Sequence, residues 1–333
     1  QIPQHHKLAG LKVKTSNLCN EITLPTGYDN HGKDRTAVCC LSSLNLETYD
    51  EWKDDNQFIE DVMKFLDNVM SDFINKAPDS FRDAKYSAMR ERSVGLGVMG
   101  LHSFFQQKNI PFGSVMSKVW NQKIFNHIQK KADEASVKLA EERGSCPDAE
   151  EYGIKERFSN KTAIAPTASI SIICGGASPG IEPIAANSYT HKTLSGSYNV
   201  RNKYLAKILD KYNKNNDEIW SSITTNQGSV SHLNFLSEEE KEVFKTAFEI
   251  DQRWIIELGA DRTPCISQAQ SINVFIPADI HKKDLHQIHF QAWKKGLKSL
   301  YYCRSKSIQR AENINDAKST DITANVYKSK NQP

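Results

Sequence analysis

Apolar residues recur every three or four positions in five stretches of the chain, the spacing at which side chains share one face of a helix. In the clearest stretch, residues 56–75, the apolar positions are Phe58, Val62, Phe65, Leu66, Val69 and Phe73. The pattern predicts helices over residues 56–75, 88–107, 118–143, 238–258 and 283–299. Ser237 precedes the fourth of these and is a favourable N-cap, because its hydroxyl can accept a hydrogen bond from a free backbone N–H.

Shorter runs that contain β-branched residues separate these helices and predict strands. The predicted strands cover residues 15–24, 36–46, 271–276 and 300–303, and a further apolar stretch over 162–174 ends at Gly175-Gly176. Because strands and helices alternate along the chain, the predicted fold class is α/β. Residues 1–312 are expected to form one catalytic body, followed by a polar tail over 313–333.

Composition and charge exclude several classes of partner. The chain has 333 residues, of which 38% are hydrophobic and 25% charged, with a net charge of +3. So small a charge does not favour nucleic acid or a membrane surface as the main partner. The chain holds no apolar run of roughly 18 residues, the length of a membrane helix, and its polar first residues do not resemble a secretory leader. A cytoplasmic location is therefore expected.

The cysteines and histidines do not form a recognisable metal site. The seven cysteines are an odd number without a CxxC pair, so we expect buried small residues or reactive thiols instead of a disulfide framework. The histidines are scattered, and we expect His5-His6, His281, His286 and His289 to lie on the surface. No metal is proposed.

Asn17, Cys19 and Glu21 alternate along the first predicted strand. In an extended strand alternate side chains share one face, and two residues span roughly 6.5 Å. An amide, a thiol and a carboxylate would then point into the same space, where the amide and carboxylate could hold the hydroxyls of a polyol while the thiol faces a C–H. The spacing alone fits equally a polar strand edge with one buried cysteine.

Four stretches, in order, resemble the large subunit of class I ribonucleotide reductases. Ser16-Asn17-Leu18-Cys19-Asn20-Glu21-Ile22, followed by Leu24-Pro25-Thr26, is similar to the thiyl-radical loop. Ala37-Val38-Cys39-Cys40-Leu41-Ser42 is similar to the strand that holds one of the two substrate-reducing cysteines. The resemblance places that role on Cys39, and we interpret Cys40 as a small core residue.

The two later stretches complete the resemblance. Ala165-Pro166-Thr167-Ala168-Ser169-Ile170-Ser171, with Gly180-Ile181-Glu182-Pro183 behind it, is similar to the phosphate-binding turn. Small hydroxyl residues and free N–H groups can hold a diphosphate, although a Ser/Thr-rich turn alone would have the same composition. Leu300-Tyr301-Tyr302-Cys303-Arg304 resembles the last barrel strand, whose two tyrosines relay a radical from the small subunit.

The resemblance implies a reaction and a role for each residue. Cys19, as a thiyl radical, would remove the 3′-hydrogen of a ribonucleoside diphosphate; Glu21 would act as base on the 3′-hydroxyl, and Asn17 would bind the substrate. Cys39 would give one reducing equivalent, and Tyr301 and Tyr302 would carry the radical in. The implied substrate-binding residues are Ser16, Asn17, Leu18, Cys19, Asn20, Glu21, Pro166, Thr167, Ala168, Ser169 and Ile170. The product would be a 2′-deoxyribonucleoside diphosphate, as DNA replication requires.

The resemblance also implies partners and an architecture. The expected fold is the C-terminal portion of a ten-stranded α/β barrel with Cys19 on a central finger loop. No cofactor would bind directly, because a metal-containing small (beta) subunit supplies the radical, and thioredoxin or glutaredoxin is the reductant. The resemblance runs from about residue 8 to about residue 312 and lacks the family's N-terminal region, with its second reducing cysteine, and its C-terminal cysteine pair. A split subunit that works with an N-terminal large-subunit fragment is therefore expected.

Two other interpretations compete with this one: a protein without catalytic activity and a different kind of enzyme. A non-catalytic assembly or binding fragment of the same complex would not turn over substrate. A glycyl-radical enzyme could share the barrel, but no glycyl-radical loop stands near the C-terminal end of this sequence.

One further motif suggests a nucleotide site of another kind. Residues 95–100 read Gly-Leu-Gly-Val-Met-Gly and satisfy G-x-G-x-x-G. The preceding residues 88–92 are charged and helical in character, and positions 112–122 contain no acidic residue to bind a ribose. We interpret the glycines as a site of close helix packing instead of a dinucleotide fingerprint.

Overall fold

The computed structural model describes residues 2–193 and 196–305 of the chain, so the predicted tail over 313–333 lies outside the described residues. The longer helices are α3 (Phe58–Lys76), α4 (Arg82–Glu91), α5 (Leu101–Gln107), α6 (Val115–Arg143), α9 (Lys203–Lys211), α10 (Asp217–Thr225), α12 (Gln252–Arg262) and α13 (Lys282–Lys294). The shorter helices are α1 (Gln4–Leu8), α2 (Tyr49–Trp52), α7 (Pro147–Glu150), α8 (Ile170–Ile173) and α11 (Glu238–Val243), with 3₁₀ turns at Leu46–Thr48, Asp79–Phe81 and Thr263–Cys265. The strands are β1 (Gly27–Tyr28), β2 (Asp34–Arg35), β3 (Cys40–Asn45), β4 (Val94–Met99), β5 (Ser188–Thr193), β6 (Gly196–Arg201), β7 (Val274–Ile276) and β8 (Cys303–Ser305).

A row of parallel segments forms the wall on which the rest of the fold is built. Strand β3 pairs with β4 along six residues, from Cys40 opposite Val94 to Asn45 opposite Met99. Single parallel bridges then join Leu96 to Thr162 and Ile164 to Gln270. Strand β7 continues from this last segment and pairs in parallel with β8. The order of neighbours fits part of the wall of an α/β barrel, and the predicted fold class is confirmed.

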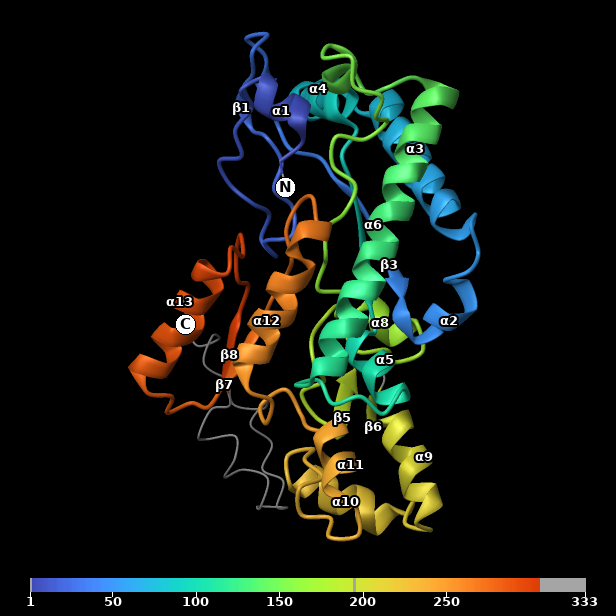
Figure 1. Cartoon of the computed structure of the whole chain (residues 1–333), viewed down its shortest axis with the longest axis vertical. Helices are drawn as coiled ribbons and strands as arrows, with labels where there is room; N and C mark the ends of the chain where they lie inside the picture. The colour runs from blue at the N-terminus through green and yellow to red at the C-terminus, as the bar shows by residue number, and fades with distance from the viewer. Residues whose placement is uncertain (1, 194–195, 306–333) are drawn as a thin grey trace, which may run out of the picture.

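Helices cover this wall on its outer side. Helix α6 packs against both α3 and α12, and α12 packs against α13; Figure 1 shows α6 running along the molecule with α12 beside it and α13 on the far side of α12. The main hydrophobic cluster joins strand residues such as Leu96 and Val98 to helix residues such as Met63, Phe125 and Ile128. Burial of each such side chain contributes roughly 1.5–3 kcal/mol to folding.

The helices predicted over 56–75, 118–143 and 283–299 correspond to α3, α6 and α13. Helix α6 begins earlier than predicted because Ser114 forms a capping box with Ser117. The strands predicted over 36–46 and 271–276 correspond to the shorter β3 and β7. These elements have strong periodicity, a good cap, or a β-branched run, which explains why the sequence reveals them.

The helix predicted over 88–107 is wrong. Helix α4 ends at Glu91, because the next residue, Arg92, adopts a left-handed conformation (φ 42°), and β4 and α5 follow. All six residues of β4 are buried, and its glycines allow close contact between strands, not between helices: a Cβ on Gly97 would lie 2.3 Å from the carbonyl oxygen of Ala163. Because two of the glycines lie inside the strand, the segment still does not match a dinucleotide-binding turn.

The helix predicted over 238–258 is two helices. The predicted cap is confirmed, because Ser237 and Glu240 form a capping box at the start of α11. The chain then turns, since Ala247 donates a backbone hydrogen bond to Ile184, and Asp251 caps α12. Hydrogen bonds between residues so far apart in the sequence do not affect the local spacing of apolar residues, so this spacing cannot predict them. Elements β5, β6, α9 and α10 were likewise not predicted.

In the part of the chain that the structure describes, no helix combines the length and the apolar character needed to cross a membrane.

We predict that Gly97→Ala lowers the free energy of unfolding by about 1–3 kcal/mol, the usual range for overpacking. The added methyl group meets backbone, which cannot move aside. Gly259→Ala is the matched control: the nearest atom to its added methyl group would be Cδ1 of Ile272 at 3.0 Å, the end of a side chain that can adjust. Chemical denaturation of both variants checks the prediction, and an equal or smaller loss for Gly97→Ala would contradict it.

Candidate active site

The loop that carries Cys19 is a tight turn and not the strand predicted over residues 15–24. The backbone N–H of Asn17 donates to the carbonyl of Ile22 (3.3 Å), and the N–H of Asn20 donates to the carbonyl of Asn17 (3.2 Å). Asn20 has a φ of 65°, which an asparagine tolerates better than most residues. Cys19 therefore projects from the tip of a loop, as the finger-loop prediction requires, and strand alternation does not position it.

The turn orients its own polar side chains. The Asn17 side-chain oxygen accepts a hydrogen bond from the N–H of Ile22 (3.0 Å), so this amide closes the loop. The hydroxyl of Ser16 donates to the side-chain oxygen of Asn20 (2.7 Å), whose nitrogen donates to the carbonyl of Leu300 (3.0 Å). Leu18 is 81% exposed, whereas Glu21 is buried. Three of the predicted substrate-binding residues in this loop therefore form hydrogen bonds that stabilise the protein itself: Ser16, Asn17 and Asn20.

The segment 268–273 holds the loop in place. The N–H of Ala269 donates to the carbonyl of Glu21 (2.9 Å), and the hydroxyl of Ser271 lies 2.5 Å from the carbonyl oxygen of Cys19. The same hydroxyl lies 3.2 Å from the carboxylate of Glu21. Because a serine hydroxyl has one hydrogen, it can donate to only one of these two oxygens at a time. Ser271 thus connects the backbone at the cysteine with the proposed base.

Tyr301 and Tyr302 lie beside Cys19. The thiol of Cys19 donates to the phenolic oxygen of Tyr301 (3.4 Å), and the two tyrosine rings stack with centroids 3.9 Å apart. Interaction with the side chain of Cys19, the larger cause, and with that of Tyr302 raises the pKa of Tyr301 above its usual value. The strand predicted over 300–303 begins only at Cys303, so the two tyrosines precede β8 and their rings meet instead of facing opposite sides. A thiol and two phenols in contact are groups that can undergo hydrogen-atom or proton-coupled electron transfer.

Cys39 lies directly before β3, where the side-chain nitrogen of Gln268 donates to its sulfur (3.2 Å). Burial raises the pKa of the Cys39 thiol to about 12, so the thiol is protonated at neutral pH. Cys40 packs against the main hydrophobic cluster, as its interpretation as a core residue predicts. Gln268 also accepts a hydrogen bond from the N–H of Thr23 (3.2 Å), which connects Cys39 with the loop of Cys19.

The predicted phosphate-binding turn folds back on the Gly180 segment. Thr167 is buried with a φ of 52°, and its hydroxyl oxygen accepts a hydrogen bond from the N–H of Gly180 (2.7 Å). Ala168, Ser169 and Ile170 are exposed, whereas Pro166 is half-buried. The sequence elements 165–171 and 180–183 therefore do come together. Their hydrogen bonds stabilise the turn itself, and their role in substrate binding stays a prediction.

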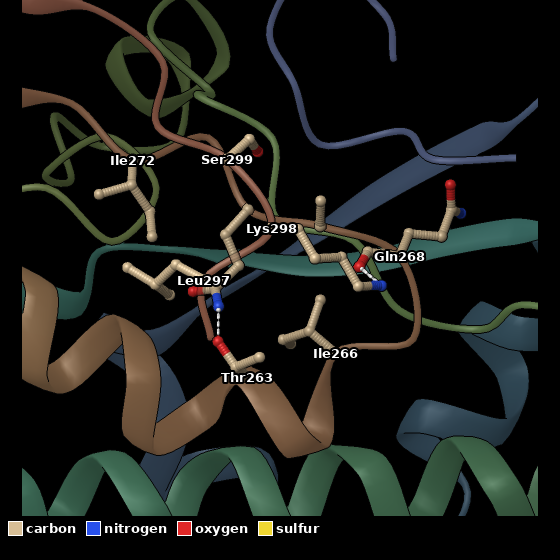
Figure 2. Close-up of a pocket in the computed structure, with 9 residues that line it drawn as sticks. Thr263, Ile266, Gln268, Ile272, Leu297, Lys298 and Ser299 are labelled. Carbon is tan, nitrogen blue, oxygen red and sulfur yellow. Dashed lines mark hydrogen bonds between the residues drawn. The ribbon is translucent and has the colours of Figure 1, made fainter. Parts of the chain in front are cut away.

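A small cavity behind segment 268–272 is not a substrate site. Its volume is about 10 Å³, room for one water molecule at most. Figure 2 shows Lys298 reaching across this cavity to the backbone of Gln268, and its ammonium group also donates to the carbonyl of Ser267 (2.8 Å). Burial lowers the pKa of Lys298 to about 8. The lysine therefore fixes the backbone that presents Gln268 to Cys39.

The prediction that His5 and His6 lie on the surface is wrong. Both are buried, with the ring of His5 bonded to the hydroxyl of Ser159 (2.8 Å) and the ring of His6 3.5 Å from Asp148. Burial lowers the pKa of His5 to about 4, so it is a neutral core residue. His281, His286 and His289 are exposed, as predicted. Within residues 2–193 and 196–305, no three His, Cys, Asp or Glu side chains gather in a way that could hold a metal ion.

Three residues that contact the site were not singled out from the sequence. Gln268, Ser271 and Asn273 are buried, and the side-chain oxygen of Asn273 accepts a hydrogen bond from the N–H of Tyr302 (2.8 Å). The available signal is the run of uncharged polar residues in 267–273, next to a predicted strand. Buried amides and hydroxyls need partners, and here the partners are the loop, Cys39 and the tyrosine segment.

Comparison with known proteins gives this arrangement a family. The ribonucleotide reductase barrel domain matches residues 2–156 and 147–303. The chain is 53% identical over 300 residues to the ribonucleoside-diphosphate reductase large subunit of Invertebrate iridescent virus 6, covering 89% of this chain and 31% of that protein. It is 42% identical over 315 residues to the putative large subunit of Frog virus 3, covering 94% and 54%.

A solved structure agrees with these sequence relatives. The class Id ribonucleotide reductase alpha subunit of Actinobacillus ureae superposes with a TM-score of 0.85 at 40% identity, over 93% of this chain and 57% of that one. The chain thus spans about a third to somewhat more than half of the length of these proteins. On the match of the barrel domain to nearly all of its described residues, the chain belongs to the ribonucleotide reductase barrel-domain family.

Proposed function

We propose that this chain is the catalytic C-terminal part of a ribonucleotide reductase large subunit, which reduces ribonucleoside diphosphates to 2′-deoxyribonucleoside diphosphates by a thiyl-radical mechanism. The observation that carries the proposal is the contact of the Cys19 thiol with Tyr301, 3.4 Å away, and the stacking of Tyr301 on Tyr302. A thiol at the tip of a partly exposed loop has no structural need for a pair of stacked phenols. The same contacts would allow a radical to pass from Tyr302 through Tyr301 to Cys19.

The residues of the loop would divide the chemistry between them. The Cys19 radical removes the 3′-hydrogen, and the carboxylate of Glu21 accepts the proton of the 3′-hydroxyl. The 2′-hydroxyl leaves as water after protonation by a thiol. Cys39 and a second cysteine supply two electrons and become a disulfide, and the Cys19 thiol finally returns the 3′-hydrogen. Asn17 would help to orient the substrate, and residues 166–170 would hold its diphosphate.

The proposal requires partners. The second reducing cysteine would come from an N-terminal region of the large subunit. A metal-containing small subunit would generate the radical that reaches Tyr302, and a thioredoxin-like or glutaredoxin-like dithiol would restore the cysteines. All seven cysteines of the chain are free, which suits a cytoplasmic protein served by such reductants. A non-catalytic binding fragment would need neither the thiol nor the tyrosine pair.

The direct test is reconstitution. The chain is combined with an N-terminal large-subunit fragment, a small subunit and dithiothreitol, and the reduction of a ribonucleoside diphosphate is measured. We expect activity in the complete mixture and none from the chain alone. Activity of the chain without the fragment would refute the requirement for an N-terminal region, and absence of activity from the complete mixture would refute the reductase assignment.

We predict that Cys19→Ser abolishes turnover in this mixture while the protein stays folded. A serine O–H holds its hydrogen too strongly to replace the thiyl radical, although its size is similar. Cys174→Ser, at an exposed cysteine, is the matched control and should keep its activity. Product formation by Cys19→Ser above a few per cent of the unsubstituted protein would eliminate the radical role.

We predict that Tyr301→Phe and Tyr302→Phe also stop turnover. Phenylalanine keeps the stacked ring but lacks the phenolic hydrogen that proton-coupled transfer needs. Substrate affinity should change by less than about 1 kcal/mol, the usual net worth of one hydrogen bond. Equilibrium binding and turnover are measured together, with Tyr28→Phe at a residue 79% exposed as the control. A large loss of affinity with turnover retained would contradict a relay function.

We predict that Cys39, and not Cys40, becomes oxidised when one turnover proceeds without external reductant. The disulfide partner should be a cysteine of the N-terminal region. Peptide mapping by mass spectrometry identifies the bond, with a reaction mixture that lacks substrate as the control. A bond between Cys39 and Cys40, or any other bond within this chain, would overturn the assignment.

A further inference from the structure

We propose that Gln268 is a positioning residue for the reduction step, whose side-chain amide donates one N–H to the Cys39 sulfur and tethers the loop of Cys19 with its oxygen. This inference rests on the proposed function for its meaning, but the contact it describes can be tested without turnover. Gln268 is fully buried, and its polar groups meet three different parts of the fold. These are the loop after Glu21, strand β4 and Cys39, which directly precedes β3.

The orientation of the amide is fixed by its backbone partners. The N–H of Thr23 can only donate, so the side-chain oxygen of Gln268 must face it at 3.2 Å. The carbonyl of Val94 can only accept, so the side-chain nitrogen must face it at 3.1 Å. An amide flip would break both bonds at once. The second hydrogen of this nitrogen is therefore left for the Cys39 sulfur, 3.2 Å away.

The backbone of Gln268 is held just as firmly. Its N–H donates to the carbonyl of Thr162 (3.0 Å), and its carbonyl accepts a hydrogen bond from the ammonium group of Lys298. Neither the main chain nor the side chain can rotate away from Cys39 without the loss of buried hydrogen bonds. The N–H that faces the sulfur is preorganised by the fold.

The electrostatic surroundings of Cys39 make this N–H the favourable contact for a thiolate. Burial raises the pKa of Cys39 to about 12, the Gln268 hydrogen bond acts in the opposite direction, and Cys40, Glu91 and Glu21 each raise the pKa further. A thiolate accepts a hydrogen bond more strongly than a thiol does. Gln268 therefore stabilises the anionic sulfur against its buried and acidic surroundings.

A thiolate at Cys39 arises when the proposed disulfide is reduced. The thiolate of an external dithiol attacks the partner cysteine's sulfur, a new S–S bond forms to the reductant, and the old S–S bond breaks. Cys39 leaves with the electron pair as a thiolate and then takes a proton. A second exchange within the reductant releases the partner cysteine, so two electrons pass from the dithiol to the disulfide. The rate of such an exchange depends on the leaving thiolate.

The test measures the reactivity of Cys39 in the chain without substrate, radical or partner. Iodoacetamide alkylates only the thiolate, and tandem mass spectrometry separates the extent of modification at Cys39 from that at Cys40. Gln268→Met removes the donor with little change in size. Gln268→Glu keeps an oxygen for Thr23 but also removes the donor. We expect each substitution to slow alkylation of Cys39 at pH 9 roughly tenfold, the effect of one lost hydrogen bond to a charged group.

A purely structural role predicts the opposite sign. If Gln268 only filled space, its replacement would loosen the site and speed the access of iodoacetamide to Cys39. Alkylation at an unchanged or higher rate, in a variant that circular dichroism shows to be folded, would overturn the proposal. Should Gln268→Met not fold, the comparison rests on Gln268→Glu. Gln270→Glu is the matched control for Gln268→Glu, because this buried glutamine accepts a hydrogen bond from Arg262 and donates to Gly259 and Thr263 instead of to Cys39. It should leave the Cys39 rate unchanged.

A second measurement joins the contact to the reaction. In the reconstituted enzyme with dithiothreitol, Gln268→Met should lower kcat while KM for the ribonucleoside diphosphate stays within a factor of about two, which is small beside the tenfold effect of one such bond. A rise in KM with kcat unchanged would contradict the role in reduction. If the unsubstituted mixture does not turn over, the proposed function fails, whereas the alkylation result still decides the role of Gln268.

Discussion

The segment from Gln268 to Asn273 must form hydrogen bonds on both of its sides, and the geometry of the site depends on this requirement. On one side its backbone bonds to Thr162 and Ile164 in the parallel wall. On the other side it bonds to Glu21 and, through the carbonyl of Ile272, to the N–H of Tyr301 (2.7 Å). Because a buried polar group without a partner costs about 1–3 kcal/mol, the loop and the tyrosines cannot shift independently of the wall.

The outer and inner faces of the wall use different kinds of polar contact. Outside it, the buried carboxylate of Asp67 binds the guanidinium groups of Arg92, Arg143 and Arg157. Burial alone would raise the pKa of Asp67, but the arginines hold it below its usual value. This ionic cluster ties α3 to the end of α4, the end of α6 and residue 157. Removal of one partner from a buried charge group costs about 3–5 kcal/mol, so the cluster fixes the helices firmly.

Inside, the groups that hold the cysteines are neutral amides and hydroxyls. Asn17, Asn20, Gln268 and Ser271 position the loop without placing a positive charge on either sulfur. A cation in contact with Cys19 would favour its thiolate, whereas the proposed radical chemistry starts from a thiol that can lose a hydrogen atom. Neutral hydrogen bonds give precision in space without that bias.

Sequence patterns predicted the parts of this protein that depend on local information. Helix α3 has one apolar face, and α11 has a serine cap with a glutamate three residues later; both features can be read from neighbouring residues. The sequence pattern predicts a helix where the structure has the buried strand β4. The strand contains two glycines and follows the charged helix α4, so its sequence does not have the features of a typical strand. Its assignment depends on the facing β3 and Ala163, which local sequence does not reveal.

The candidate site shows the same division. The family resemblance singled out Cys19 and Tyr301, which are in contact although 282 residues separate them. The extended strand expected around Cys19 was wrong, because the φ of Asn20 and the hydrogen bond that the Asn17 side chain accepts from the N–H of Ile22 close a turn. Gln268 and Ser271 carried no motif, and only the three-dimensional structure brings them to the loop. Their identification required knowledge of which buried donors and acceptors meet.

The strands at the two ends of the parallel wall, β3 and β8, restrict where a disulfide partner of Cys39 can lie. Among residues 2–193 and 196–305, β3 pairs only with β4, and β8 pairs only with β7. Each therefore has an outer edge whose N–H and C=O groups need partners, and closure of a barrel is the arrangement that removes such edges. Cys39 directly precedes β3, so it stands at one of these edges. A strand that completes the wall beside β3 would come within reach of Cys39, and a cysteine on that strand would be placed to share a disulfide with it.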